Sequence, residues 1–128
     1  MLEQIDYKTI FHYFEEISKV PRGSYHNEKI SDYLVQFAKE RAIAYRQETC
    51  GNVIFWKPAS PDCRSTKTVM MQGHMDMVCV CEDDSHDFTT EGLNLQIRGD
   101  WLEAEKTTLG GDDGIALAYI LAVFADDT

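Results

Sequence analysis

One stretch, residues 107–125 (TTLGGDDGIALAYILAVFA), joins a glycine-rich acidic turn to an almost wholly apolar segment. Its glycines, Gly110, Gly111 and Gly114, let the backbone turn sharply beside two aspartates. The apolar run over residues 115–125 predicts a helix, and a helix that is apolar on every side has to be covered on every side. Because the run is well short of the roughly 20 residues that cross a bilayer, we interpret it as a core helix.

On either side of this helix, the chain alternates helical and strand-like patterns. Apolar residues at three- and four-residue steps predict helices over residues 7–19 and 27–41. Apolar alternation beside turn-forming residues predicts antiparallel hairpins over residues 44–57 and 93–104. The run over residues 68–72 (TVMMQ) predicts a strand buried on both faces. The expected fold is therefore α/β, with a central mixed sheet flanked by helices in one unit without linkers or repeats.

Composition argues against several classes of partner. Lys and Arg total 12 against 22 Asp and Glu, which gives a formal net charge of -10. Such a surface repels phosphate backbones and anionic lipid headgroups, so we expect neither nucleic acid nor a membrane as a partner. The first residues show no basic segment followed by an apolar one, so a cytoplasmic protein is expected. The four cysteines are then reduced thiols, and Cys79-Val80-Cys81 lacks the second pair typical of a structural zinc knuckle.

The first candidate site follows the predicted strand, in Gly73-His74-Met75-Asp76. Side chains two residues apart on a strand point to the same face, so His74 and Asp76 are expected to meet. A metal-bound imidazole usually donates its other N–H to a carboxylate, which fixes the tautomer and the ring orientation. The pattern alone is weak, because a histidine satisfied by a local aspartate at a strand end looks the same.

The second candidate site is the acidic turn before the apolar helix, with Asp112 and Asp113. One aspartate could serve as an N-cap, which stabilises a helix by about 1 kcal/mol, and acids suit the positive end of the helix dipole. A second aspartate leaves a carboxylate free to bind or bridge cations. Phosphate binding at the helix start is disfavoured, since two carboxylates would repel it. Imidazole and carboxylate together favour zinc or a similar divalent ion, in the crevice where strand ends meet helix starts.

Four motifs, in this order and spacing, resemble the aminoacyl-histidine dipeptidases (Xaa-His dipeptidases, carnosinase-like), zinc metallopeptidases grouped with peptidase T and acetylornithine deacetylase. The resemblance extends over essentially the whole chain. The motifs are residues 73–78 (GHMDMV), 86–88 (HDF), 99–104 (GDWLEA) and 107–115 (TTLGGDDGI).

The resemblance implies that His74 binds one zinc, that Asp112 bridges two zincs, and that Asp76 is a catalytic-assisting carboxylate that supports His74. Asp113 is then a neighbour and not a ligand. In the family, a water between two metals is deprotonated by a glutamate and attacks the dipeptide carbonyl. That glutamate and the remaining ligands come from sequence beyond residue 125. One departure concerns Lys106, which stands where the family usually has glycine.

Residues 1–128 are therefore expected to be the N-terminal part of a catalytic domain, inactive by itself, without the lid and dimerisation domain or the C-terminal part of the catalytic domain. The full-length protein is expected to be a homodimeric, two-zinc dipeptidase for small peptides such as Xaa-His, with cobalt or manganese as alternative metals. A deacylase or tripeptidase of the same superfamily is one alternative. A truncated product or binding module that keeps the fold without the chemistry is another.

Overall fold

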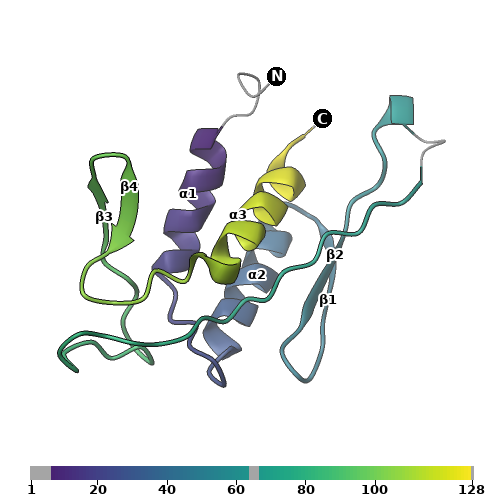
Figure 1. The fold of residues 1–128 in the computed structure, drawn as a ribbon. Helices are drawn as coiled ribbons and strands as arrows, with labels where there is room; N and C mark the ends of the chain where they lie inside the picture. The colour runs from purple at the N-terminus through teal and green to yellow at the C-terminus, as the bar shows by residue number, and fades with distance from the viewer. Residues whose placement is uncertain (1–6, 64–66, 128) are drawn as a thin grey trace.

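The computed structural model describes residues 7–63 and 67–127. Within these ranges, short antiparallel hairpins flank a group of helices (Figure 1). The elements, in chain order, are α1 (Tyr7–Ser18), α2 (Glu28–Glu40), β1 (Ala44–Gln47), β2 (Val53–Trp56), the 3-10 turn η2 (Pro61–Cys63), β3 (Leu95–Arg98), β4 (Trp101–Ala104) and α3 (Gly111–Ala125).

The predicted helices and hairpins are confirmed, with small shifts at their ends. The helix expected at residues 7–19 is α1 and the one at 27–41 is α2. Strands β1 and β2 pair antiparallel from Ala44 opposite Trp56, and β3 and β4 pair antiparallel from Leu95 opposite Ala104. These elements depend on local patterns, which the sequence carries directly.

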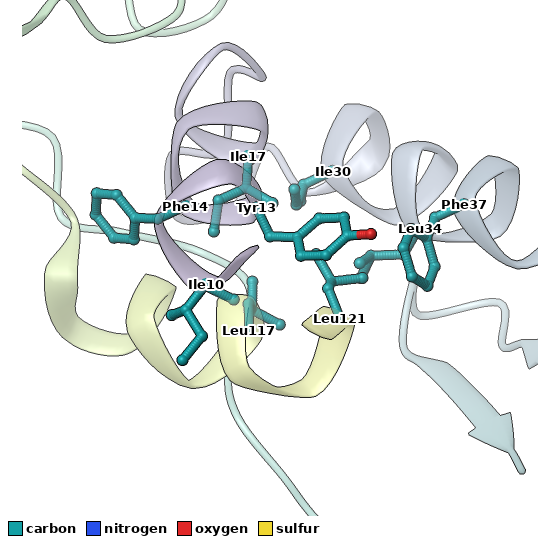
Figure 2. Close-up of a cluster of buried hydrophobic side chains, with 10 residues drawn as sticks. Ile10, Tyr13, Phe14, Ile17, Ile30, Leu34, Phe37, Leu117 and Leu121 are labelled. Carbon is teal, nitrogen blue, oxygen red and sulfur yellow. The ribbon is translucent and has the colours of Figure 1, made fainter. Parts of the chain in front are cut away.

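The core lies where the three helices meet. Helices α1 and α3 run side by side, and α2 closes the group from behind (Figure 1). Figure 2 shows Tyr13 of α1 between the side chains of the other two helices, with Leu34 and Leu121 nearby. The cluster consists of Ile10, Tyr13, Phe14, Ile17, Ile30, Leu34, Phe37, Leu117, Ala118 and Leu121. This spacing is the one predicted for amphipathic helices, so α1 and α2 use their apolar stripes as expected.

The strand predicted at residues 68–72 is wrong. These residues form no regular strand, and the side chains of Val69 and Met70 are 83% and 89% exposed. A strand buried on both faces needs neighbouring strands that accept and donate its backbone hydrogen bonds. The two hairpins are separate two-stranded sheets, so no strand of the described residues pairs with this segment. The extended chain that continues from it passes in front of the helices (Figure 1).

The α/β class is confirmed, whereas the sheet of the described residues is two antiparallel hairpins and not one central mixed sheet. The apolar helix α3 is covered on one side only. Ile115, Tyr119 and Val123, at four-residue steps, form an exposed stripe on it. Residues 7–63 and 67–127 contain no helix with the length and apolarity needed to cross a bilayer.

Candidate metal site

The two candidate sites meet in space. His74, on the extended segment, and Asp112, at the start of α3, are 38 residues apart in the chain. His74 Nε2 lies 3.0 Å from Asp112 Oδ1. The other ring nitrogen, Nδ1, lies 2.9 Å from the carbonyl oxygen of Asp76 and 3.1 Å from its Oδ1. Both nitrogens of one imidazole therefore face acceptor oxygens from two different segments.

This arrangement favours a positive charge at His74. A neutral imidazole has one N–H donor, so it can satisfy only one of the two acceptor groups, whereas a protonated ring or a ring bound to a cation satisfies both. Burial by itself lowers the pKa of His74, but the hydrogen bonds to Asp112 and to the Asp76 backbone, with both carboxylate charges, raise it above its usual value. The site is thus built to attract a proton or a cation between His74 Nε2 and Asp112.

Asp76 is held on its far side by Ser24. The Ser24 hydroxyl donates a hydrogen bond of 2.5 Å to Asp76 Oδ2, while Asp76 Oδ1 faces the His74 ring. This hydrogen bond, more than the neighbouring imidazole, lowers the pKa of Asp76 below its ordinary value. The carboxylate therefore stays ionised at neutral pH and remains an acceptor for the Nδ1–H of His74.

Asp112 does not cap the helix. Position Gly110, in the left-handed conformation with φ 65°, precedes the first turn, and no side chain accepts a capping hydrogen bond there. Asp112 has the non-helical φ and ψ of -93° and 107°, the peptide bond to Asp113 is cis, and the Asp112 side chain is 96% exposed. Because Gly110 holds the N-cap position, the Asp112 carboxylate does not serve as an N-cap, and its Oδ1 instead faces His74 Nε2.

Asp113 lies in a different place. Its carboxylate packs against Gly73, where an added Cβ would come within 3.0 Å of Asp113 Oδ2. The glycine before His74 thus makes room for the second aspartate. Of the acidic pair, one carboxylate faces the imidazole and the other lies beside the backbone of the extended segment.

The donor set fits a divalent cation but is incomplete. Two ligands of a tetrahedral zinc, each about 2.0–2.1 Å from the metal, are about 3.3 Å apart, close to the His74–Asp112 distance of 3.0 Å. Zinc sites use three or four protein ligands. The described part of the chain contains no group of three or more His, Cys, Asp or Glu side chains placed to hold a metal. The pair fits part of a zinc site, to be completed by other groups.

Comparison with known proteins gives a consistent result. The chain is 38% identical, over 127 residues, to the cytosol non-specific dipeptidase of Escherichia coli strain K12. Its structure matches the crystal structure of aminoacylhistidine dipeptidase from Vibrio alginolyticus with a TM-score of 0.90 at 36% identity. The chain is homologous to these dipeptidases. Both alignments cover 98% of this chain but only 26% of the relative, so the chain spans about a quarter of their length. No family model matches the chain.

Lys106, the departure from the pattern of the dipeptidases, keeps a backbone that suits glycine. Its φ is 60°, in the left-handed region that L-residues rarely adopt. The carbonyl oxygen of Lys106 accepts the N–H of Glu82 at 2.9 Å, and its ammonium group lies 2.8 Å from Asp83 Oδ2. The lysine therefore occupies a strained backbone conformation in this dipeptidase homologue.

Sequence reasoning missed two residues beside the site, Arg22 and Ser24, in the loop between α1 and α2. Arg22 is 2% exposed, and Ser24 binds Asp76 as described above. The helices predicted over residues 7–19 and 27–41 leave this loop as a connection between them. No local signal shows that a loop arginine will be buried, because its partners lie more than 50 residues further along the chain.

Proposed function

We propose that this chain is the N-terminal part of the catalytic domain of a metal-dependent dipeptidase that hydrolyses small peptides such as Xaa-His dipeptides. The contact of His74 Nε2 with Asp112 Oδ1 at 3.0 Å, with Nδ1 held by Asp76, carries this proposal. The homology to two dipeptidases over nearly the whole chain supports the peptidase class. The Escherichia coli relative is a cytosol dipeptidase, which supports a cytoplasmic location for this protein.

In this proposal, His74 is a ligand of one zinc, Asp112 is the carboxylate shared between two zincs, and Asp76 is the catalytic-assisting carboxylate. Asp76 accepts the Nδ1–H of His74, which leaves the lone pair of Nε2 directed at the side of Asp112. Ser24 fixes the Asp76 carboxylate and keeps it ionised. Bound zinc would supply a Lewis acid for the peptide carbonyl and a water of lowered pKa.

The proposal assigns no turnover to residues 1–128 alone. Two protein ligands hold a divalent ion much less well than four, and the dipeptidase pattern takes its general base from sequence beyond residue 125. The longer protein is proposed to be a homodimer that supplies the remaining ligands and the base, with cobalt or manganese as alternatives to zinc. A search of the reading frame downstream for two adjacent glutamates would test whether the general base and a further ligand are present.

The test measures zinc binding by calorimetry in the wild-type chain and in the variants His74→Ala and Asp112→Ala. We expect weak zinc binding or none in the wild type, and the loss of any such binding in either variant. The matched controls are His12→Ala, an exposed histidine on α1, and Asp100→Ala, an exposed aspartate in the turn between β3 and β4, and both should bind as the wild type does. Zinc binding of equal strength in all five proteins would refute the ligand assignment.

The same substitutions in the longer protein test the reaction. Both His74→Ala and Asp112→Ala should abolish hydrolysis of Xaa-His dipeptides together with metal content, measured by product release and by elemental analysis. A protein that keeps two zincs after both changes would contradict the assignment. A protein that binds zinc but hydrolyses acylated amino acids and not dipeptides would instead be a deacylase.

A further inference from the structure

Arg22 is a buried charge that the proposed reaction does not use. Its side chain is the largest among those that are fully buried in the described residues, with 2% of the residue exposed. A guanidinium is rarely buried without a specific set of partners, because removing it from water is costly. Burial lowers the pKa of Arg22 and the charges of Asp76 and Cys79 raise it, and the group stays protonated at neutral pH.

The partners of Arg22 are backbone carbonyls from both halves of the candidate site. Nη2 donates a hydrogen bond of 2.7 Å to the carbonyl oxygen of Gly110, two residues before Asp112. Nη1 donates one of 3.3 Å to the carbonyl oxygen of Met75, which lies between His74 and Asp76. One planar group thus connects the extended segment to the turn before α3.

The backbone of the arginine is fixed to the same segment. The N–H of Met77 donates to the carbonyl oxygen of Arg22 at 3.0 Å, and the N–H of Ser24 donates to the carbonyl oxygen of Met77 at 3.1 Å. These bonds surround the parallel bridge between Gly23 and Met77. The backbone of Arg22 is therefore fixed relative to the segment that carries His74 and Asp76, and this fixes where the guanidinium begins.

Two of the glycines in the acidic turn are needed for this approach. A Cβ at position 110 would lie 2.5 Å from Arg22 Nη2, and one at position 114 would lie 2.7 Å from the same nitrogen. Real Cβ atoms do not come so close to a buried group that has no room to move. The glycines that the sequence marked as turn formers thus also make space for the arginine.

We propose that Arg22 is the positioning residue that sets the separation of His74 and Asp112, by holding the carbonyls of Met75 and Gly110 in one fork. The purpose of this positioning, a metal site, rests on the proposed function. The hydrogen bonds from Arg22 to Met75 and Gly110 are observed independently of that function. A lysine has a single ammonium on a flexible stem and lacks the rigid fork that bridges two acceptors. Arg22 is not a ligand and contacts no substrate.

The first experiment uses the unaltered wild-type chain. Nuclear magnetic resonance at low temperature should show protected Arg22 Nη–H protons with hydrogen-bond couplings to the carbonyl carbons of Gly110 and Met75. Arg98, on β3 with a 74% exposed side chain, is the internal reference for an unprotected guanidinium. Exchange of Arg22 protons as fast as those of Arg98, without such couplings, overturns the proposal.

The second experiment compares Arg22→Lys and Arg22→Met with the control Arg98→Lys. The nuclear Overhauser contact between the His74 ring and the Asp112 β-protons should be present in the wild type and in Arg98→Lys, and lost in both Arg22 variants. The contact between the Tyr13 and Phe37 rings in the helical core, whose centroids are 5.6 Å apart, should persist in all four proteins, because it does not depend on the fork. Retention of the His74–Asp112 contact in both Arg22 variants overturns the proposal.

Other outcomes are also decisive. If both Arg22 variants lose the core contacts, Arg22 is a structural residue and the positioning role is refuted. Where zinc binds the wild-type chain, the Arg22 variants should bind it on the order of 10–100-fold more weakly, as for other groups that orient ligands. If the longer protein binds no zinc while the His74–Asp112 contact in this chain still depends on Arg22, the positioning role is supported and the proposed metal function fails.

Discussion

The most direct test of the backbone leading to Asp112 is a pair of substitutions at position 106, Lys106→Gly and Lys106→Ala. Lys106 has φ 60°, and the left-handed conformation costs an L-residue about 1–2 kcal/mol. Glycine adopts this conformation at no steric cost, whereas alanine keeps the strain. The unfolded state of the glycine variant is also more flexible, and this conformational entropy offsets about 0.4–1 kcal/mol of the stability gained by relieving the strain. The glycine variant should therefore be roughly 0.5–1 kcal/mol more stable than the alanine variant.

Comparing the two variants with each other removes the contribution of the lysine's ion pair to stability. Lys106 Nζ pairs with Asp83 Oδ2 at 2.8 Å on the surface, and both variants lose this pair equally. The hydrogen bonds from Lys106 and then Ser85 hold the pKa of Asp83 at about 2 in the wild type. Because this folded-state pKa is below the ordinary value, the pair stabilises the protein above about pH 4, and the contribution is lost as the pH falls towards 2.

The assay is urea unfolding followed by circular dichroism at pH 7, for the wild type and both variants under identical conditions. The glycine variant should show the higher midpoint of the two with the same slope. A carbon-13 titration should show the Asp83 pKa rising towards its ordinary value in both variants. An alanine variant at least as stable as the glycine variant would refute the claim that Lys106 is strained.

Further predictions follow from burial and from the contacts of the site. Leu121→Ala, at a fully buried position of α3, should lower the free energy of unfolding, measured with urea, by about 2–5 kcal/mol. Val123→Ala, on the exposed face of the same helix, should lower it by less than about 1 kcal/mol. Equal losses would contradict the placement of the core. Ser24→Ala should raise the pKa of Asp76 in a carbon-13 titration, and an unchanged pKa would show that the hydroxyl does not hold this carboxylate. Val69→Lys should leave the urea midpoint nearly unchanged, since Val69 is 83% exposed; a large drop in the midpoint would mean that this segment is buried.

The helices and hairpins could be predicted because their signals are local. The spacing of Ile10, Phe14 and Ile17 describes one face of a helix before any partner is known, and the same holds for the turn at Gly51. The candidate pair His74 and Asp112 was assigned to one site by resemblance and by the kinds of side chain present. The structure brings the two side chains to hydrogen-bond distance.

The run over residues 68–72 shows the limit of such reasoning. An apolar, partly β-branched run has the composition of a buried strand, but pairing depends on which other strands lie beside it. In the described residues neither β1–β2 nor β3–β4 extends to this run, so its backbone has no ladder and its side chains are exposed. Composition alone could not show that no strand of the described residues pairs with this run.

By itself, the sequence determined the helices, the hairpins and the types of group at the candidate site, since each is encoded within a few neighbouring residues. Only the tertiary structure decided that a loop arginine is buried between Met75 and Gly110, and that Ser24 holds Asp76. Those contacts join residues that are more than 50 positions apart, and hydrogen-bond partners at such separations are selected by the packing of the whole chain and not by local propensity.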